Sequence, residues 1–314
     1  MNAFTKYKIK SNRDAFYVLG ALVAMFILLM IIHPRFLTIQ NLVGLVQQSI
    51  FLLIISIGMT FVIIAGGLDL SVGSLMALVS SISAMTMSHY GFLTGVVMGL
   101  LIAFIIGLLN GISIVILRIN PFIATLASML IARGLSNTIT NARNVKIPTQ
   151  FMDFGQNITL GIPNLWLITL IICLLGYYII HMTGYGIKIY AVGSNSDAAY
   201  VSSVQVKLVV LTSYIFCSLS AGVAGLVLTF RFNSGLPQSG SFLELFSIAA
   251  VVLGGTRIGG GRGGILRTVI GVFLIALLQN GLNLFSVNYY IQQISIGLVF
   301  ILAAGANLIV SKNF

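Results

Sequence analysis

The chain has 314 residues, of which 58% are hydrophobic and only 7% are charged, whereas an ordinary soluble domain has about 25% charged residues. This composition predicts a membrane protein. Ten membrane-spanning helices of about 20 residues would use about 200 positions. We therefore expect no soluble enzyme domain. The length also excludes an ATP-hydrolysing domain, which would need about 100 to 200 residues of its own.

The charge balance is strongly basic, with 16 Lys and Arg against 5 Asp and Glu and a net charge of +11. In a membrane protein such an excess indicates topology rather than nucleic-acid binding, because cytoplasmic loops collect Lys and Arg. The two cysteines, Cys173 and Cys217, lie in apolar runs and are interpreted as small core residues. The sequence has no metal-ligand spacing, no Ser/His/Asp combination and no Walker lysine, so we expect neither a catalytic nor a metal site.

The first expected helix covers 15–32 and follows a tail, residues 1–14, that holds four basic residues. No small-residue cleavage site follows this helix, so we expect an uncleaved span with a cytoplasmic N-terminus. Nine further apolar runs follow at 49–65, 75–87, 92–117, 121–139, 165–182, 208–230, 242–254, 268–284 and 291–310. The sequence therefore predicts an all-α, polytopic membrane protein. Residues 1–314 would form a single transmembrane domain with about ten helices, some short or interrupted.

Two of these runs, 75–87 and 242–254, have only about 13 residues, whereas a full crossing needs about 20. They are candidates for half-helices, re-entrant segments or interfacial segments. Ten crossings that begin inside would place eleven basic residues on the cytoplasmic side and four outside. This distribution supports the expected orientation.

The longest expected loops lie at 141–164 on the outer side and at 183–207 on the inner side. The outer loop contains Pro148, Pro163 and Asp153 and would present a surface to an external partner. The inner loop has a helix-compatible stretch at 197–201. Two interpretations of the inner loop stay open, a short cytoplasmic helix or a solvated connection.

Two of the five acids, Asp69 and Glu244, lie within or beside apolar segments, where an ionisable group costs several kcal/mol unless it has a partner. Asp69 belongs to the stretch GGLDLSVGS at 66–74, whose glycines permit an unwound backbone. Either Asp69 or Ser71 caps the helix that resumes after the break, or Asp69 lines a polar pathway. A broken helix at membrane depth must be buried in protein or line a wet cavity, so both interpretations place it near a pathway.

A second glycine-rich stretch at 254–264 contains the spacing of a dinucleotide-binding fingerprint at Gly259, Gly261 and Gly264. The strand and βαβ unit that this fingerprint requires are not expected here. We interpret the stretch as a tight cytoplasmic turn that allows close helix packing.

Three asparagines, Asn110, Asn280 and Asn283, lie in or near apolar helices beside glycines. The first interpretation is hydrogen bonding to a neighbouring helix. The second is contact with a hydroxyl-rich ligand, because amides both donate and accept hydrogen bonds.

Four stretches together resemble one family. They are GGLDLSVGS at 66–74, PFIATL at 121–126 followed by Arg133 and Gly134, YAVGSN at 190–195 followed by Ala198 and Ala199, and VVLGGT at 251–256 followed by Gly281, Leu282 and Asn283. In this order they are similar to the membrane permease subunits of bacterial ribose-, galactose-, xylose- and arabinose-type ABC importers. The resemblance covers roughly residues 35–305.

The resemblance implies an all-helical permease in the bacterial inner membrane, without catalytic residues of its own. Its expected partners are a second permease subunit, identical or homologous, a cytoplasmic ABC ATPase, and a periplasmic or lipid-anchored sugar-binding protein. ATP and Mg²⁺ would bind the ATPase, and no cofactor would bind this chain. On this basis we select five candidate residues for the substrate pathway, namely Asp69, Ser71, Asn110, Thr125 and Asn280.

The resemblance also implies that the inner loop, 183–207, is a coupling loop whose short helix docks into a groove of the ATPase. The residues expected to make this contact are Ala191, Gly193, Asn195, Asp197, Ala198 and Ala199.

The sequence departs from the pattern of the family at four positions. Ser194 and Ser203 stand where a glycine is usual or frequent, Tyr200 stands where an arginine is often found, and Phe246 stands where an aspartate is common. These departures concern the match to the partner ATPase and to the sugar rather than the subunit type.

Two other functions stay open. The first is a stand-alone secondary transporter or channel, for which Asp69 and Glu244 would be the only ion-coupling acids in the membrane. The second is an ABC permease for a nucleoside or a signalling furanose, since Asn and Thr side chains suit the hydroxyl groups of all these ligands.

Overall fold

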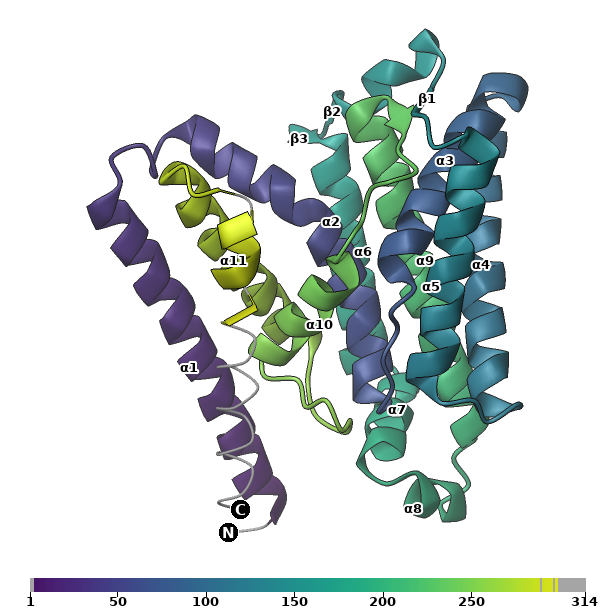
Figure 1. Ribbon diagram of the computed structural model, residues 1–314. Helices are drawn as coiled ribbons and strands as arrows, with labels where there is room; N and C mark the ends of the chain where they lie inside the picture. The colour runs from purple at the N-terminus through teal and green to yellow at the C-terminus, as the bar shows by residue number, and fades with distance from the viewer. Residues whose placement is uncertain (1–2, 289, 296, 299–314) are drawn as a thin grey trace.

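The computed structural model describes residues 3–288, 290–295 and 297–298, with side-chain environments from Val18 onward. Helices make up most of the chain (Figure 1). The part of the chain that the structure describes has eight long helices, namely α1 (Ala3–Ile32), α2 (Ile39–Ile64), α3 (Val72–Tyr90), α4 (Phe92–Val115), α5 (Pro121–Thr140), α6 (Asn164–Met182), α9 (Val206–Phe232) and α11 (Ile265–Leu284). The three short helices are α7 (Gly184–Ser194), α8 (Ser196–Val201) and α10 (Leu243–Leu253).

The few strands gather at one end of the helices, the upper end in Figure 1. β1 (Val145–Lys146) pairs antiparallel with β4 (Ser234–Gly235), with Val145 opposite Gly235. β2 (Ile158–Thr159) and β3 (Ile162–Pro163) form a second antiparallel pair. Together with the 3₁₀ helix η1 (Thr149–Gly155), they give the long loop between α5 and α6 a folded structure.

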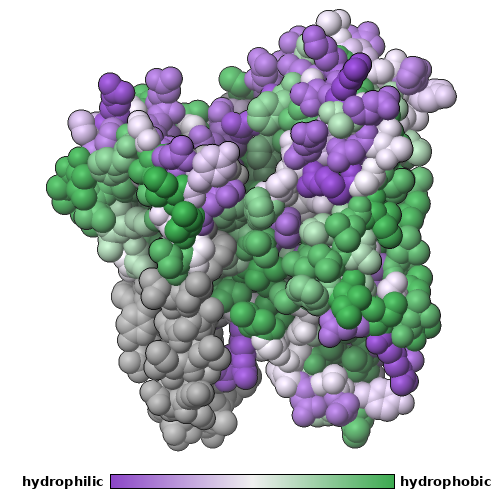
Figure 2. All heavy atoms as spheres, in the orientation of Figure 1, coloured by the Kyte–Doolittle hydropathy of each residue, from purple (hydrophilic) through white to green (hydrophobic). Residues whose placement is uncertain are grey.

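Six of the described helices, α2, α4, α5, α6, α9 and α11, are long and apolar enough to cross a membrane. Figure 2 agrees with this, since hydrophobic residues form a band across the middle of the molecule and hydrophilic residues gather toward the two ends. The structure is therefore that of a mostly helical, polytopic membrane protein. The predicted number of ten spans is not confirmed by these six helices.

The core forms where α9 packs against α2, α3 and α4. Small residues allow the helix backbones to approach closely, as is usual in membrane bundles. A Cβ atom added at Gly58 of α2 would lie 2.8 Å from Cα of Cys217 in α9. A Cβ atom at Gly107 of α4 would lie 2.9 Å from Cα of Ile215. Cys217 is buried and has a free thiol, as expected for a small core residue.

Local capping explains several helix boundaries. α2 begins at Ile39, ten residues before the predicted run 49–65, because the Thr38 hydroxyl accepts a hydrogen bond from the Asn41 N–H group. α5 begins where Asn120 caps the Phe122 N–H group at 2.9 Å and Pro121 occupies the first turn. The predicted start of the second span, at residue 49, was wrong, since α2 already begins at Ile39.

The two short predicted runs have different outcomes. The run 75–87 is part of the 19-residue helix α3, which spans about 28 Å at 1.5 Å per residue; serines and a histidine at its ends hide its length in a hydropathy profile. The run 242–254 is the 11-residue helix α10, about 16 Å long and too short to cross alone. The last predicted run, 291–310, falls mostly outside the described residues.

Candidate functional site

The break between α2 and α3 begins at Gly66, which is exposed, and becomes buried from Asp69 onward. α2 ends where Gly66 takes a φ of 91°, a conformation that glycine adopts without strain. The next residue, Gly67, lies directly against the Tyr214 hydroxyl of α9, in a space that no side chain would fit. Asp69 and Ser71 follow in the break, and both are 0% exposed.

A chain of hydrogen bonds ties this break to two other helices. One carboxylate oxygen of Asp69, Oδ1, accepts from the Ser71 N–H group at 2.9 Å and from the Ser71 hydroxyl at 2.6 Å. The Ser71 oxygen accepts from the Asn110 side-chain amide of α4 at 3.2 Å. The Ser128 hydroxyl of α5 donates to Asn110 Oδ1. We call Asp69, Ser71, Asn110 and Ser128 the break network.

The second oxygen of Asp69, Oδ2, has no hydrogen-bond partner among the described residues. The Cys217 thiol of α9 lies beside this carboxylate. The Tyr214 hydroxyl also lies near the Asp69 carboxylate, but it donates its hydrogen bond to the Leu68 carbonyl at 3.2 Å. The Asp69 carboxylate is therefore enclosed by α9 on one side and held by Ser71 on the other.

The structure brings together three of the five predicted pathway residues, Asp69, Ser71 and Asn110. Thr125 is fully buried on α5, one turn before Ser128, and its hydroxyl donates to the Pro121 carbonyl at 2.8 Å. The predicted helix cap takes a different form, because the Ser71 side chain makes no capping bond to α3. Asp69 instead closes a local turn by binding the N–H group two residues later.

Asn280 lies elsewhere, at the far end of α11. It pairs with Asn41 of α2 through two reciprocal amide hydrogen bonds of 3.1 and 2.8 Å. Interhelical hydrogen bonding is thereby confirmed for Asn280 and Asn110. A contact with substrate stays a prediction for both residues.

The Asn41 and Asn280 pair gives a direct stability prediction. We expect a double-mutant cycle with Asn41→Ala and Asn280→Ala, measured by unfolding in detergent, to give a coupling energy of about 0.6 to 1.7 kcal/mol, the range found for hydrogen bonds between membrane helices. The Asn41 amide also donates to the Phe36 carbonyl at 2.9 Å, so Asn41→Ala should cost more than Asn280→Ala, and the double variant should lose less than the sum of the two single losses. Fully additive losses would contradict this.

Glu244 stands at the first turn of α10, against the start of α3. One of its carboxylate oxygens lies beside Gly73, where an added Cβ would be 2.5 Å away. Arg133 of α5 acts on Glu244 through its charge. The same guanidinium donates to the carbonyls of Pro237 at 2.9 Å and Ser239 at 2.7 Å, in the loop before α10. Glu244 therefore lies between α10 and the start of α3, while Arg133 of α5 binds the loop before α10.

The loop 183–207 contains two helices, α7 and α8, where the sequence predicted at most one short helix. Asn195 caps α8 by accepting from the Ala198 N–H group at 2.9 Å. Tyr200 and Val201 at the end of α8 are 75% and 83% exposed. Ser203 takes a φ of 63°, which explains why glycine suits this position.

The predicted coupling residues divide into an outer and an inner group. Asn195, Asp197 and Ala198 are exposed, whereas Ala199 is buried and Ala191 is partly buried. Gly193 packs against the carbonyl of Ile64 at the end of α2 and against Gly261 in the loop before α11. α8 therefore presents a surface outward while α7 contacts the membrane helices.

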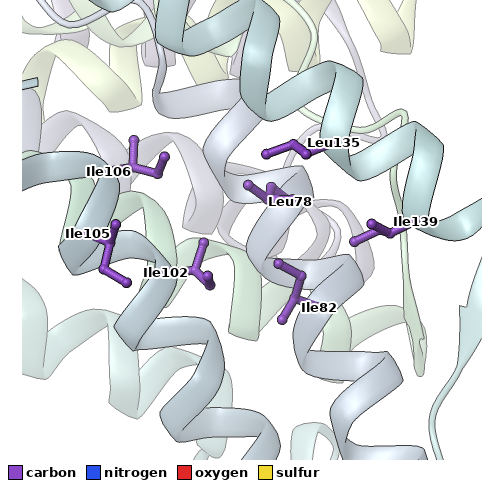
Figure 3. A pocket seen from close by; sticks show the side chains of 7 residues that line it. All are labelled: Leu78, Ile82, Ile102, Ile105, Ile106, Leu135 and Ile139. Carbon is purple, nitrogen blue, oxygen red and sulfur yellow. The ribbon is translucent and has the colours of Figure 1, made fainter. Parts of the chain in front are cut away.

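One hollow of about 260 Å³ lies between α3, α4 and α5, lined by seven aliphatic side chains (Figure 3). It offers no donor or acceptor side chain, so a sugar would lose the hydrogen bonds of its hydroxyl groups there. Among the described residues, no three His, Cys, Asp or Glu side chains are grouped to hold a metal ion.

Comparison with known proteins identifies the family. The family described as the permease component of the branched-chain amino acid transport system matches residues 41–304. The chain belongs to this permease family. It is 38% identical to the ribose import permease protein RbsC of Escherichia coli over 292 residues, covering 90% of this chain and 91% of RbsC. It is equally similar to RbsC of Bacillus subtilis, with 91% of each chain covered.

The D-allose transport system permease protein AlsC of Escherichia coli is 33% identical over 301 residues, covering 95% of this chain and 91% of AlsC. No solved structure matches the chain. These relatives are permeases, and the chain is a multi-pass membrane protein of the same kind.

Ser128 was not selected from the sequence, because a serine in an apolar helix has no distinctive pattern.

Proposed function

We propose that this chain is the transmembrane permease subunit of an ATP-driven ABC importer that moves a monosaccharide of the ribose type across the bacterial inner membrane. The observation that carries the proposal is the 38% identity to two ribose import permeases over about nine tenths of each chain. The buried polar break in α2–α3 fits this function, because an interrupted helix in a membrane marks a polar region inside the bundle.

The proposed complex contains two permease subunits, identical or homologous, two ATPase domains and a sugar-binding protein outside the membrane. ATP and Mg²⁺ bind the ATPase, and this chain holds no cofactor. Binding and hydrolysis of ATP would switch the two permeases between outward-facing and inward-facing states. The exposed face of α8, with Asp197, Ala198 and Tyr200, is the proposed docking surface for the ATPase.

The proposed orientation places the N-terminus in the cytoplasm. The start of α1, the α4–α5 turn, the α7–α8 segment and the connection between α10 and α11 lie toward the same end of the molecule (Figure 1). These segments contain most of the basic residues, which favours a cytoplasmic position. In this topology α1 and α3 add two crossings, and α10 enters only part of the bilayer.

The test is reconstitution of the chain with its ATPase and binding protein in proteoliposomes. We expect uptake of labelled ribose or allose that requires ATP and the loaded binding protein. Uptake by this chain alone under an ion gradient would contradict the proposal and favour a secondary transporter. Retention of a nucleoside or a furanose signal by the binding protein, with uptake of that ligand only, would leave the ABC mechanism intact and overturn the sugar assignment.

A further inference from the structure

A second hollow lies between α2, α10 and α11, away from the break network. Its polar lining consists of Gln48 and Ser49 of α2 and Gln279 of α11, and Phe246 of α10 forms an aromatic wall. Three aliphatic side chains complete it. We call this space the α2–α10–α11 hollow.

Gln48 is exposed and Gln279 is partly exposed at this hollow. Among the described residues, neither glutamine side chain makes a hydrogen bond to another residue. The contrast with the next residue of α11 is direct, since Asn280 pairs with Asn41 through two amide hydrogen bonds. The Ser49 hydroxyl donates to the Val46 carbonyl at 2.8 Å, and its oxygen keeps the capacity to accept.

Both glutamines of the hollow lie inside helices that are long and apolar enough to cross a membrane. Gln48 is nine residues after the start of α2, about 14 Å along the helix axis, and Gln279 is five residues before the end of α11, about 8 Å along the axis. Two amides without protein partners are costly at such depth if they face hydrocarbon. They become favourable if they face water or a polar ligand.

The lining also selects the type of ligand. None of the lining residues is charged, so a zwitterion such as an amino acid would find no ionic partner. Arg231 is engaged nearby with the Gln47 carbonyl and lies over the rings of Phe51 and Phe232. Amides both donate and accept, as neighbouring hydroxyl groups of a sugar do, and the Phe246 ring offers an apolar wall for C–H groups.

We propose that the α2–α10–α11 hollow is a transient contact site for the hydroxyl groups of a neutral sugar as it crosses the permease. The site deepens the proposed function and rests on it. The volume of about 60 Å³ has room for a few water-sized groups, so the hollow holds one edge of the ligand rather than enclosing it. Such partial contact suits a permease, because the sugar must be released easily.

The first experiment uses the full complex in proteoliposomes, with ribose and allose as probes. We expect Gln48→Leu and Gln279→Leu each to lower sugar uptake at least 5-fold, while ATP hydrolysis stimulated by the loaded binding protein stays within 2-fold of wild type. Gln47→Leu is the matched control, since it makes the same change on the same helix outside the lining, and its uptake should stay within 2-fold. Wild-type uptake by both lining variants would overturn the site.

The second experiment does not depend on transport. Single Gln48→Cys and Gln279→Cys variants are treated with a membrane-impermeant, charged thiol reagent, with Leu130→Cys on the exposed apolar face of α5 as the lipid-side control. We expect labelling at 48 and 279 above the wild-type background, and none at 130. No labelling at 48 and 279 means that the hollow faces lipid and overturns the site. Failure of the proposed function is a separate result, namely no ATP-dependent sugar uptake by wild type.

Discussion

Replacement of Asp69 by alanine is expected to destabilise the protein by about 2 to 4 kcal/mol and to lower sugar uptake at least 10-fold. The Asp69 carboxylate accepts both the N–H group and the hydroxyl of Ser71, and both residues are fully buried. Alanine leaves these donors without an acceptor, and each buried unsatisfied group costs about 1 to 3 kcal/mol. Loss of the turn would also release the Ser71 hydroxyl from the Asn110 amide of α4.

The Asp69→Asn variant tests the hydrogen-bond acceptor of Asp69 separately from its negative charge. The asparagine keeps an oxygen for Ser71, and its NH₂ group replaces Oδ2, which has no hydrogen-bond partner among the described residues and lies near the Tyr214 hydroxyl and the Cys217 thiol. We expect stability close to wild type and uptake within 3-fold, because the break network needs the acceptor. Unfolding in detergent and uptake in proteoliposomes measure the two effects. A stable Asp69→Asn variant that does not transport would show instead that the charge acts in the pathway.

Asn110→Leu tests the same network from α4. It removes the donor to Ser71 and the acceptor of Ser128 while keeping a similar volume. A smaller loss than that of Asp69→Ala is expected, because the Ser71 and Ser128 hydroxyls can turn toward their own helix carbonyls. A larger loss would place the centre of the network at Asn110.

Long apolar helices could be located from the sequence because their residues are almost all apolar over about 20 positions. The predicted run 92–117 corresponds to α4 and the run 165–182 corresponds to α6 within a few residues. The start of α2 was missed because Gln47 and Gln48 interrupt its apolar run. These amides sit inside the helix, where the pattern suggests a boundary.

The candidate site was only partly predictable. Asp69 and Ser71 are neighbours in the chain, and their glycine-rich setting marks a break. The partners of polar side chains inside the bundle depend on packing between distant segments, as for Asn41 and Asn280, which are 239 residues apart. Ser128 carries no local signal at all. A single sequence therefore identifies which polar groups need partners, whereas only the fold identifies the partners.

The inner loop illustrates the same limit. The stretch 197–201 was helix-compatible, and α8 forms there. α7 was not predicted because Gly184 and Gly186 lower its helix propensity. Its stability comes from packing, since buried Ile189 and Val192 join a cluster with Phe61 and Ile64 of α2.

The coupling loop meets the membrane helices at a closely packed junction. Gly193 at the end of α7 lies against the Ile64 carbonyl, and the same carbonyl accepts from the Gly261 N–H group at 2.9 Å. The Tyr190 hydroxyl donates to the Gly263 carbonyl at 2.8 Å. Three segments therefore meet at this junction, and the end of α2 leads directly into the break that holds Asp69.

Gly193→Val is expected to lower ATP-driven uptake at least 10-fold while the ATPase still co-purifies with the permease. A side chain at Gly193 must displace backbone atoms of α2 and of the loop before α11, and such overpacking costs about 1 to 3 kcal/mol. The docking face on α8 is left unchanged. The measurement is uptake and ATP hydrolysis in proteoliposomes, where we expect hydrolysis to persist without proportionate sugar movement.

Gly184→Ala is the matched control for this junction. It lies at the other end of α7, and an added Cβ atom meets no atom within 4 Å, so uptake should stay within 2-fold of wild type. Ala198→Trp on the exposed face of α8 should instead prevent co-purification of the ATPase. Normal coupling in Gly193→Val would mean that the motion reaches the membrane helices by another route. Loss of the ATPase from Gly193→Val would mean that this glycine shapes the docking surface itself. We expect Ala198→Trp to affect ATPase binding and Gly193→Val to affect coupling. The reason is that α8 faces outward, whereas Gly193 packs against the end of α2, next to the break.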